Sequence, residues 1–87
     1  MKKKQVEMKT NGFPVIQAKL FAHKAAEYES EIRIVWEEKN IISDGKSILG
    51  LMAMEVKQGT QIVLTAEGAD EERAVDELVD WLETYPV

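Results

Sequence analysis

The chain has no cysteine among its 87 residues. This absence excludes disulfide bonds, thiolate metal sites and cysteine nucleophiles. The sequence also has a single histidine, no glycine-rich phosphate-binding loop and no evident pair of nucleophile and base. We therefore expect no independent enzymatic activity, no cofactor and no metal site.

Long apolar runs are also missing. None approaches the roughly 20 residues that a helix needs to cross a bilayer. The lysines at residues 2–4 lead into a short alternating segment, where a signal peptide would have a longer apolar core. These features predict a soluble, cytoplasmic protein without a membrane partner.

Positive charge is scarce, and the formal net charge is -5. A chain of this charge has no broad basic surface, so direct binding to nucleic acid is not expected. The composition, 45% hydrophobic and 31% charged, is that of a folded globular chain. Its length suffices for one small core, and residues 1–87 are predicted to form a single domain.

Alternation of apolar and polar residues predicts four strands. They cover residues 3–9, 31–37, 41–42 and 61–67. The side chains expected to face inward in the second and fourth strands are Ile32, Ile34, Trp36, Ile62, Leu64 and Ala66. Polar turn sequences are expected at residues 37–40, 43–46 and 57–60.

Three segments are expected to be helices, at residues 15–28, 47–54 and 69–83. In the first, apolar residues at helical spacing form a stripe on one side of the helix. Its members are Val15, Ala18, Phe21, Ala22, Ala25 and Tyr28. Ile16 and Leu20 lie one turn apart on the opposite, polar side, so helical phase predicts that both are exposed.

The second predicted helix is apolar on all sides. Ser47 is a strong candidate for its N-cap, because a serine oxygen accepts hydrogen bonds from the free backbone N–H groups of a first turn. We expect Leu51 and Met54 in the core and the other apolar side chains available to a partner. The element order β-α-β-β-α-β-α, with short connections, predicts an α+β fold: a four-stranded antiparallel sheet with three helices on one face.

Several segments together resemble the HPr family, the histidine-containing phosphocarrier proteins of the bacterial sugar phosphotransferase system. They are Gly12, "KSILGLM" at residues 46–52, "KQGTQIVLTAEG" at 57–68 and "DEERAVDELV" at 70–79. The resemblance covers nearly the whole chain. It implies the open-faced β-sandwich of that family and a bacterial cytoplasmic location.

The family carries its phosphoryl group on a histidine in the motif glycine-x-histidine-alanine-arginine-proline. The resemblance places Pro14 at the histidine position, Ile16 at the arginine position and Gln17 at the proline position. Carrier activity is therefore expected to be absent. The only histidine, His23, lies seven residues beyond Ile16, about 10 Å along a helix at 1.5 Å per residue, and is predicted to be a solvated surface residue.

Ser47 matches the serine that a kinase phosphorylates in many members of the family. A family member without the carrier histidine but with this serine resembles, in kind, the catabolite-repression paralogue Crh, although Crh keeps the arginine that is missing here. The resemblance therefore implies regulatory phosphorylation at Ser47. The alternative is that Ser47 only caps the helix.

Partner binding is expected where the first predicted helix begins and along the second, since these regions meet protein partners in the family. The predicted contact residues are Val15, Ile16, Leu20, Ile48, Leu49 and Met52. Candidate partners are HPr kinase, a catabolite-control transcriptional regulator and phosphotransferase enzymes. Two alternatives remain open: an active phosphocarrier with a non-standard site, or a module that forms a homodimer through its apolar patch.

Overall fold

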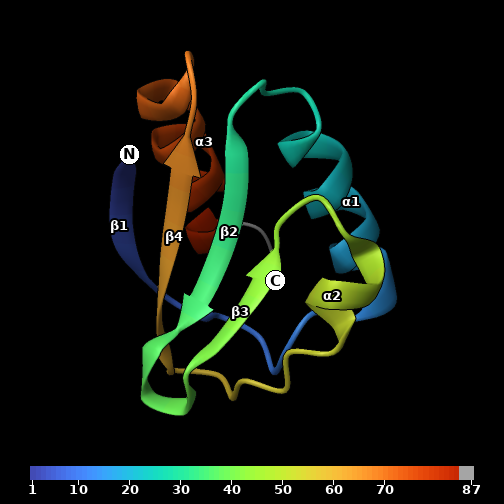
Figure 1. Ribbon diagram of the computed structural model, residues 1–87. Helices are drawn as coiled ribbons and strands as arrows, with labels where there is room; N and C mark the ends of the chain where they lie inside the picture. Colours follow the sequence, from blue (N-terminus) through green and yellow to red (C-terminus); the bar gives the residue numbers. More distant parts are fainter. Residues whose placement is uncertain (85–87) are drawn as a thin grey trace.

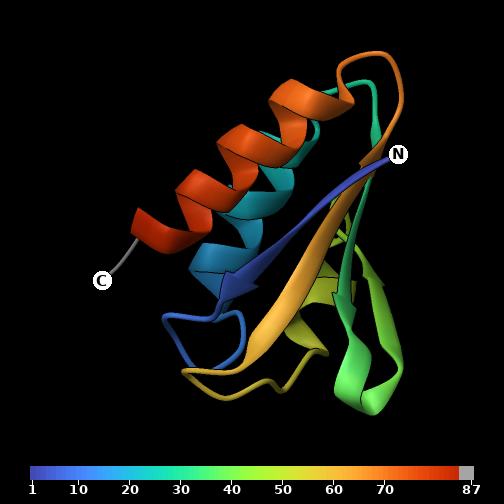
Figure 2. The same ribbon diagram turned by 90° about the vertical axis from the view of Figure 1, so that its left-hand side faces the viewer.

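The computed structural model describes residues 1–84, which form one sheet layer and one helix layer (Figures 1 and 2). Four antiparallel strands make a single sheet in the order β1-β4-β2-β3. The strands are β1 (Lys2–Glu7), β2 (Glu31–Trp36), β3 (Ile41–Asp44) and β4 (Gln61–Glu67). β4 and β2 are central, so each has a neighbouring strand on both sides, whereas β1 and β3 are edge strands.

The helices are α1 (Val15–Ala25), α2 (Ile48–Met52) and α3 (Glu71–Thr84), and a short 3₁₀ helix, η1 (Glu37–Lys39), joins β2 to β3. Figure 2 shows α1 and α3 on one side of the sheet, while the other side of the sheet is uncovered. α2 packs against α1 and β3 at one edge of this layer. The predicted element order and the open-faced architecture are confirmed.

The core lies between the sheet and the helix layer. The predicted inward residues of β4 are all buried, and each of Leu64 and Ala66 is paired across the sheet with an isoleucine of β2. Phe21 of α1 is fully buried and contacts the ring of Trp81, whose centroid lies 5.6 Å away. Leu51 and Met54 are buried as predicted, so α2 is anchored by its inner side.

Several predicted boundaries are wrong by a few residues. α1 ends at Ala25. Tyr28 lies in the turn that follows, and its N–H donates a hydrogen bond to the carbonyl of Ala25. β3 continues through Ser43 and Asp44, which had been expected in a loop. α2 ends at Met52, two residues earlier than expected. The extension of β3 depends on its pairing with Arg33 and Ile34 of β2, which local sequence patterns do not contain.

Val15, which helical phase places on the apolar side of α1, is 52% exposed, in agreement with its place among the predicted contact residues. Phe13, just before α1, is buried instead and packs against Phe21, with ring centroids 5.9 Å apart. This ring fills the core at that end, and the first turn of α1 stays at the surface. Gln17 takes an unpredicted buried place, where the Thr10 hydroxyl donates to its side-chain oxygen at 3.0 Å.

Within residues 1–84, no helix is long and apolar enough to span a bilayer. In the same residues, no group of three or more histidine, aspartate and glutamate side chains is placed to hold a metal ion.

Candidate functional site

The start of α1 is held against the segment that follows α2. The Gly12 N–H donates to the carbonyl of Val56 at 2.7 Å. Gly12 has a φ of +64°, and a Cβ there would lie 3.0 Å from the carbonyl oxygen of Met54. Only glycine combines this left-handed backbone with so close an approach. Gly12 therefore fixes where the helix begins.

Pro14 is the residue that precedes the first turn of α1. Its carbonyl accepts a hydrogen bond from the N–H of Ala18 at 2.8 Å, but its side chain offers no cap to the helix. The first turn also has no acidic residue. Hence no side chain of this turn provides either a nucleophile or a compensating negative charge.

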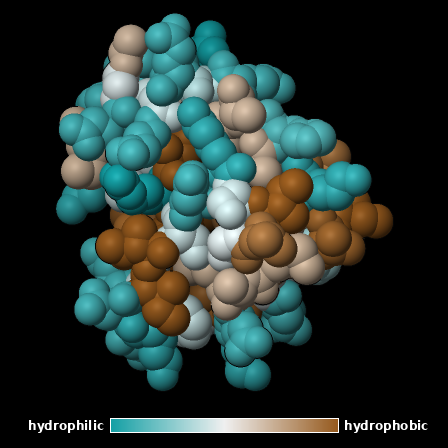
Figure 3. Space-filling model, turned by 45° about the vertical axis from the view of Figure 1, so that its right-hand side comes forward, coloured by the Kyte–Doolittle hydropathy of each residue, from teal (hydrophilic) through white to brown (hydrophobic). Residues whose placement is uncertain are grey.

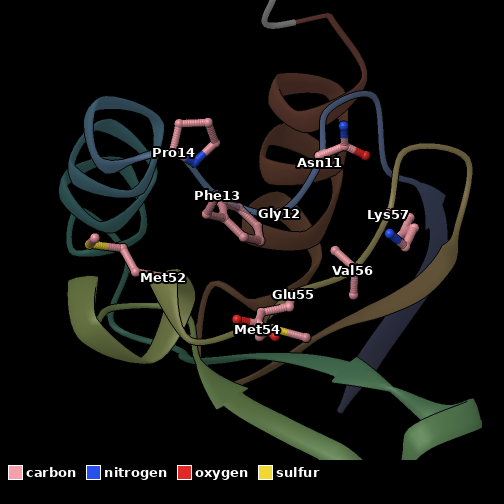
Figure 4. A pocket seen from close by; sticks show the side chains of 9 residues that line it. All are labelled: Asn11, Gly12, Phe13, Pro14, Met52, Met54, Glu55, Val56 and Lys57. Carbon is pink, nitrogen blue, oxygen red and sulfur yellow. The ribbon is translucent and has the colours of Figure 1, made fainter.

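A hollow of about 270 Å³ lies between the start of α1 and the segment after α2. Figure 4 shows Pro14 and Met52 on one side of it, and Asn11 and Lys57 on the other. Phe13, Met54 and Val56 lie beneath it but are almost completely buried, so most of the surface that lines the hollow is polar.

Ser47 is the N-cap of α2, as predicted. Its hydroxyl oxygen accepts a hydrogen bond from the N–H of Gly50 at 3.0 Å, and its backbone is extended. The neighbouring Lys46 donates from Nζ to the carbonyl of Tyr28 at 2.8 Å, which ties this turn to the end of α1. Ser47 is half-buried, so its hydroxyl lies at the margin of the surface that α1 and α2 share.

Apolar side chains gather on the outer surface of α1 and α2. Five of the six predicted contact residues are exposed, with exposed fractions from 42% for Met52 to 79% for Leu49. These five, which we call the α1–α2 patch, are Val15, Ile16, Leu20, Leu49 and Met52. Figure 3 shows extensive apolar surface on this face of the molecule. The sixth, Ile48, is half-buried and packs partly against the core.

Sequence reasoning missed a second exposed apolar pair, on edge strand β3. Ile41 and Ile42 are 40% and 61% exposed. Ile42 lies opposite Val35 of β2, on the uncovered face of the sheet. The alternation rule could not reveal this exposure, because the two isoleucines are adjacent and point to opposite faces.

His23 lies in the last turn of α1 and is exposed, as predicted. It forms no hydrogen bond or ion pair with any residue between 1 and 84. The structure therefore places no acid, base or orienting group beside this imidazole.

Two polar networks join α3 and the residue before it to the turn that follows α1. Hydrogen bonds from the Ser30 hydroxyl and from the N–H groups of Glu29 and Ser30 lower the pKa of the Asp70 carboxyl to about 2. Burial, and a hydrogen bond from Tyr28 to Glu77, raise the pKa of the Tyr28 hydroxyl far above its usual range. Both networks join α3 to the end of α1 and are structural.

A comparison with protein families supplies the identification. The family model described as "PTS HPr component phosphorylation site" matches residues 3–84. The chain belongs to the HPr family. This membership confirms the family resemblance of the sequence.

Two curated relatives illustrate the range within the HPr family. The chain is 38% identical over 85 residues to the phosphocarrier protein HPr of Borreliella burgdorferi, covering 98% of this chain and 96% of the relative. It is also 38% identical over 84 residues to the HPr-like protein Crh of Halalkalibacterium halodurans, covering 95% of this chain and 98% of the relative. The chain is thus similar to phosphocarrier and Crh members alike.

Solved structures agree with the fold. HPr of Thermoanaerobacter tengcongensis superposes with a TM-score of 0.84 and 38% identity, covering 97% of this chain and 93% of that one. A second structure of that HPr, described as a dimer, has a TM-score of 0.72 and 39% identity, covering 97% of this chain and 95% of that one.

Proposed function

We propose that this protein is a regulatory docking member of the HPr family, similar in kind to Crh, that carries no phosphoryl group at the start of α1. The observation that supports this proposal is Pro14. It stands where the family resemblance places the carrier histidine, just after Gly12 and directly before the first turn of α1.

The chemistry of this position excludes a carrier role there. The nitrogen of Pro14 is a tertiary amide, which has no basic lone pair with which to accept a phosphoryl group. Ile16, at the arginine position, has no charge to stabilise one. Free N–H groups at a helix N-terminus favour an anion, but without a nucleophile they cannot hold a phosphoryl group covalently.

Ser47 is the proposed regulatory position. A phosphate on this hydroxyl would add negative charge beside the N–H groups of α2, an arrangement that helix termini favour. It would also add strong negative charge at the margin of the α1–α2 patch. We propose that a kinase modifies Ser47 in the cytoplasm, and that the modification changes which partner occupies the patch.

Incubation with HPr kinase and ATP, followed by mass spectrometry, tests the regulatory part. We expect one phosphate, confined to Ser47, in the wild type and none in Ser47→Ala. Ser47→Asn is the matched control, because asparagine also caps helices but offers no hydroxyl. Loss of the phosphate in a variant that keeps the helix cap would assign the effect to the hydroxyl. An unmodified wild type would refute regulation by this kinase.

The α1–α2 patch is the proposed docking surface for the kinase, a catabolite-control regulator and phosphotransferase enzymes. Its five side chains are exposed apolar groups on two packed helices, the arrangement expected of an interaction site. Crosslinking to these proteins should be weakened by Ile16→Ser and by Leu49→Ser, and not by Ile42→Ser on the opposite side of the sheet.

Homodimer formation is the alternative favoured by a specific observation, since the HPr of Thermoanaerobacter tengcongensis has been solved as a dimer. Sedimentation of the purified chain distinguishes the two proposals. A dimer that Leu49→Ser dissociates would mean that the patch pairs with a second copy. An active phosphocarrier that uses a non-standard site is the remaining alternative, with His23 as the available histidine.

A further inference from the structure

One face of the sheet is not covered by a helix (Figure 2). Because Val6, Ile34 and Ile62 are buried on the helix side, alternation places the side chains on either side of them on the uncovered face. The strand register aligns these outward side chains in rows that cross all four strands. The charged row consists of Lys3, Thr65, Arg33 and Asp44, and the neighbouring apolar row consists of Gln5, Val63, Val35 and Ile42.

The two ends of the apolar row differ in shape. At the end on β3, the side chain of Ile42 is 61% exposed and projects from the face. At the other end, a recess of about 300 Å³ is lined by Lys3, Lys4, Gln5, Glu37 and Val63. Val63 is nearly buried and lies at the base of this recess. The row therefore has an apolar projection at one end and a recess at the other.

The two ends of the charged row differ in sign. Lys3 on β1 and Asp44 on β3 are both exposed, and neither forms an ion pair with a residue between 1 and 84. Arg33, between them, already pairs with Glu31 at 2.9 Å. The carboxylate of Asp44 accepts a hydrogen bond only from the backbone N–H of Lys46 among the described residues. The row thus ends in an unpaired cation on β1 and an unpaired anion on β3.

We propose that the uncovered face binds the same face of a second copy of this chain. The two-fold axis would run parallel to the strands, between β4 and β2. Such an axis reverses each row, so that β3 of one copy lies over β1 of the other. Ile42 would enter the recess of the second copy, and Lys3 would lie opposite Asp44 of the second copy. By symmetry each contact is made twice.

The difference between the row ends is the argument for a second copy. A two-fold interface requires one surface to be complementary to itself, and here projection meets recess while cation meets anion. An axis along the rows would instead place β1 over β1 and each recess over another recess. The face also carries Glu31, Glu37 and Glu67, so its charge disfavours an anionic membrane or nucleic acid.

The size of the face limits the strength of the dimer. Four strands about 4.8 Å apart and about six residues long give roughly 400 Å² per copy. Stable interfaces typically bury about 800 Å² on each partner. We therefore expect a weak dimer that forms at high protein concentration and is weakened by salt. α1 and α3 lie on the opposite side of the sheet, so this contact does not depend on the α1–α2 patch or on Ser47.

Sedimentation equilibrium of the intact protein, from micromolar to millimolar concentration, tests the proposal. We expect a reversible equilibrium between monomer and dimer. Concentration-dependent shifts in the ¹⁵N spectrum should occur at Gln5, Val35 and Ile42. Ile42→Asp should abolish the dimer, because it places a charge in the recess. Leu49→Ser, in the α1–α2 patch, is the matched control and should leave the dimer unchanged.

A charge exchange tests the orientation of the two copies. Lys3→Glu places carboxylates opposite each other and should weaken the dimer about tenfold. Asp44→Lys should weaken it similarly. The double variant Lys3→Glu/Asp44→Lys restores opposite charges across the interface, so its dissociation constant should return to within about threefold of the wild-type value. Circular dichroism would confirm that each variant is folded.

Four results would overturn the proposal. They are a chain that stays monomeric at millimolar concentration, a dimer that persists in Ile42→Asp, a dimer dissociated by Leu49→Ser, and a double variant no stronger than either single charge variant. Phosphorylation of Ser47 by the kinase is measured separately, so a failure of the dimer would leave the proposed regulatory function intact.

Discussion

At the residue scale, Ser47 combines a capping role with a proposed regulatory role, and substitutions can separate the two. Its hydroxyl oxygen caps α2 through the N–H of Gly50, and its hydroxyl is the proposed phosphate acceptor. The cap is a property of the fold and is present whether or not a kinase acts. The stability of Ser47 variants therefore measures the capping role independently of phosphorylation.

We predict that Ser47→Ala lowers the free energy of unfolding by about 1 kcal/mol, because the first turn of α2 loses its acceptor. Ser47→Asn should lose less than half of that, since the asparagine oxygen accepts the same bond. Urea denaturation followed by circular dichroism measures both. An alanine variant as stable as the wild type would contradict the capping role.

We predict that Asp70 makes the free energy of unfolding depend on pH in the acid range. In the folded state its pKa is about 2, below its ordinary value of 3.8. The unfolded chain therefore binds more protons between these values, and the stabilisation by Asp70 is complete above about pH 4 and is lost as pH falls toward 2. Asp70→Asn should be less stable at neutral pH and should show a smaller loss of stability over this window.

Thermal unfolding at several pH values between 2 and 7 checks this prediction. Asp80→Asn is a suitable control, because the carboxylate of Asp80 accepts no hydrogen bond from the described residues. The prediction fails if both variants follow the same acid profile as the wild type.

At the scale of the element, α2 has one side buried in the core and one side exposed at the surface. Leu51 is completely buried and anchors the helix to the core, while Leu49, two residues earlier, is 79% exposed. The two residues have identical side chains and therefore the same helix propensity. Any difference between them therefore reports packing alone.

Leu51→Ala is expected to cost about 2 to 5 kcal/mol of stability, because it removes buried methyl groups and leaves a cavity. Leu49→Ala should change stability by no more than about 0.5 kcal/mol, as surface substitutions do. Denaturant titration gives both values. Comparable losses in the two variants would mean that Leu49 also packs in the core.

The elements were predictable where a single rule decides the outcome. Alternation correctly predicted that Ile62, Leu64 and Ala66 of β4 are buried but missed Val63, and helical phase correctly predicted that Ile16 and Leu20 are exposed. The stripe on α1 did not reveal that Val15 is exposed while Phe13, which lies outside the helix, fills the core there. Helical phase contains no information about such a neighbour.

At the scale of the whole molecule, the family and its fold were predictable from the sequence, and the shape of the site was not. The hollow is formed by residues about 40 positions apart, which meet because Gly12 pairs with Val56.

The central claim is that an HPr-family fold acts here without carrying a phosphoryl group on α1. Incubation with the general phosphotransferase enzyme and labelled phosphoenolpyruvate tests it most directly, with the HPr of Borreliella burgdorferi as the positive control. We predict that the control becomes labelled and that this protein does not. An acid-labile phosphohistidine on the wild type, abolished by His23→Gln, would contradict the account.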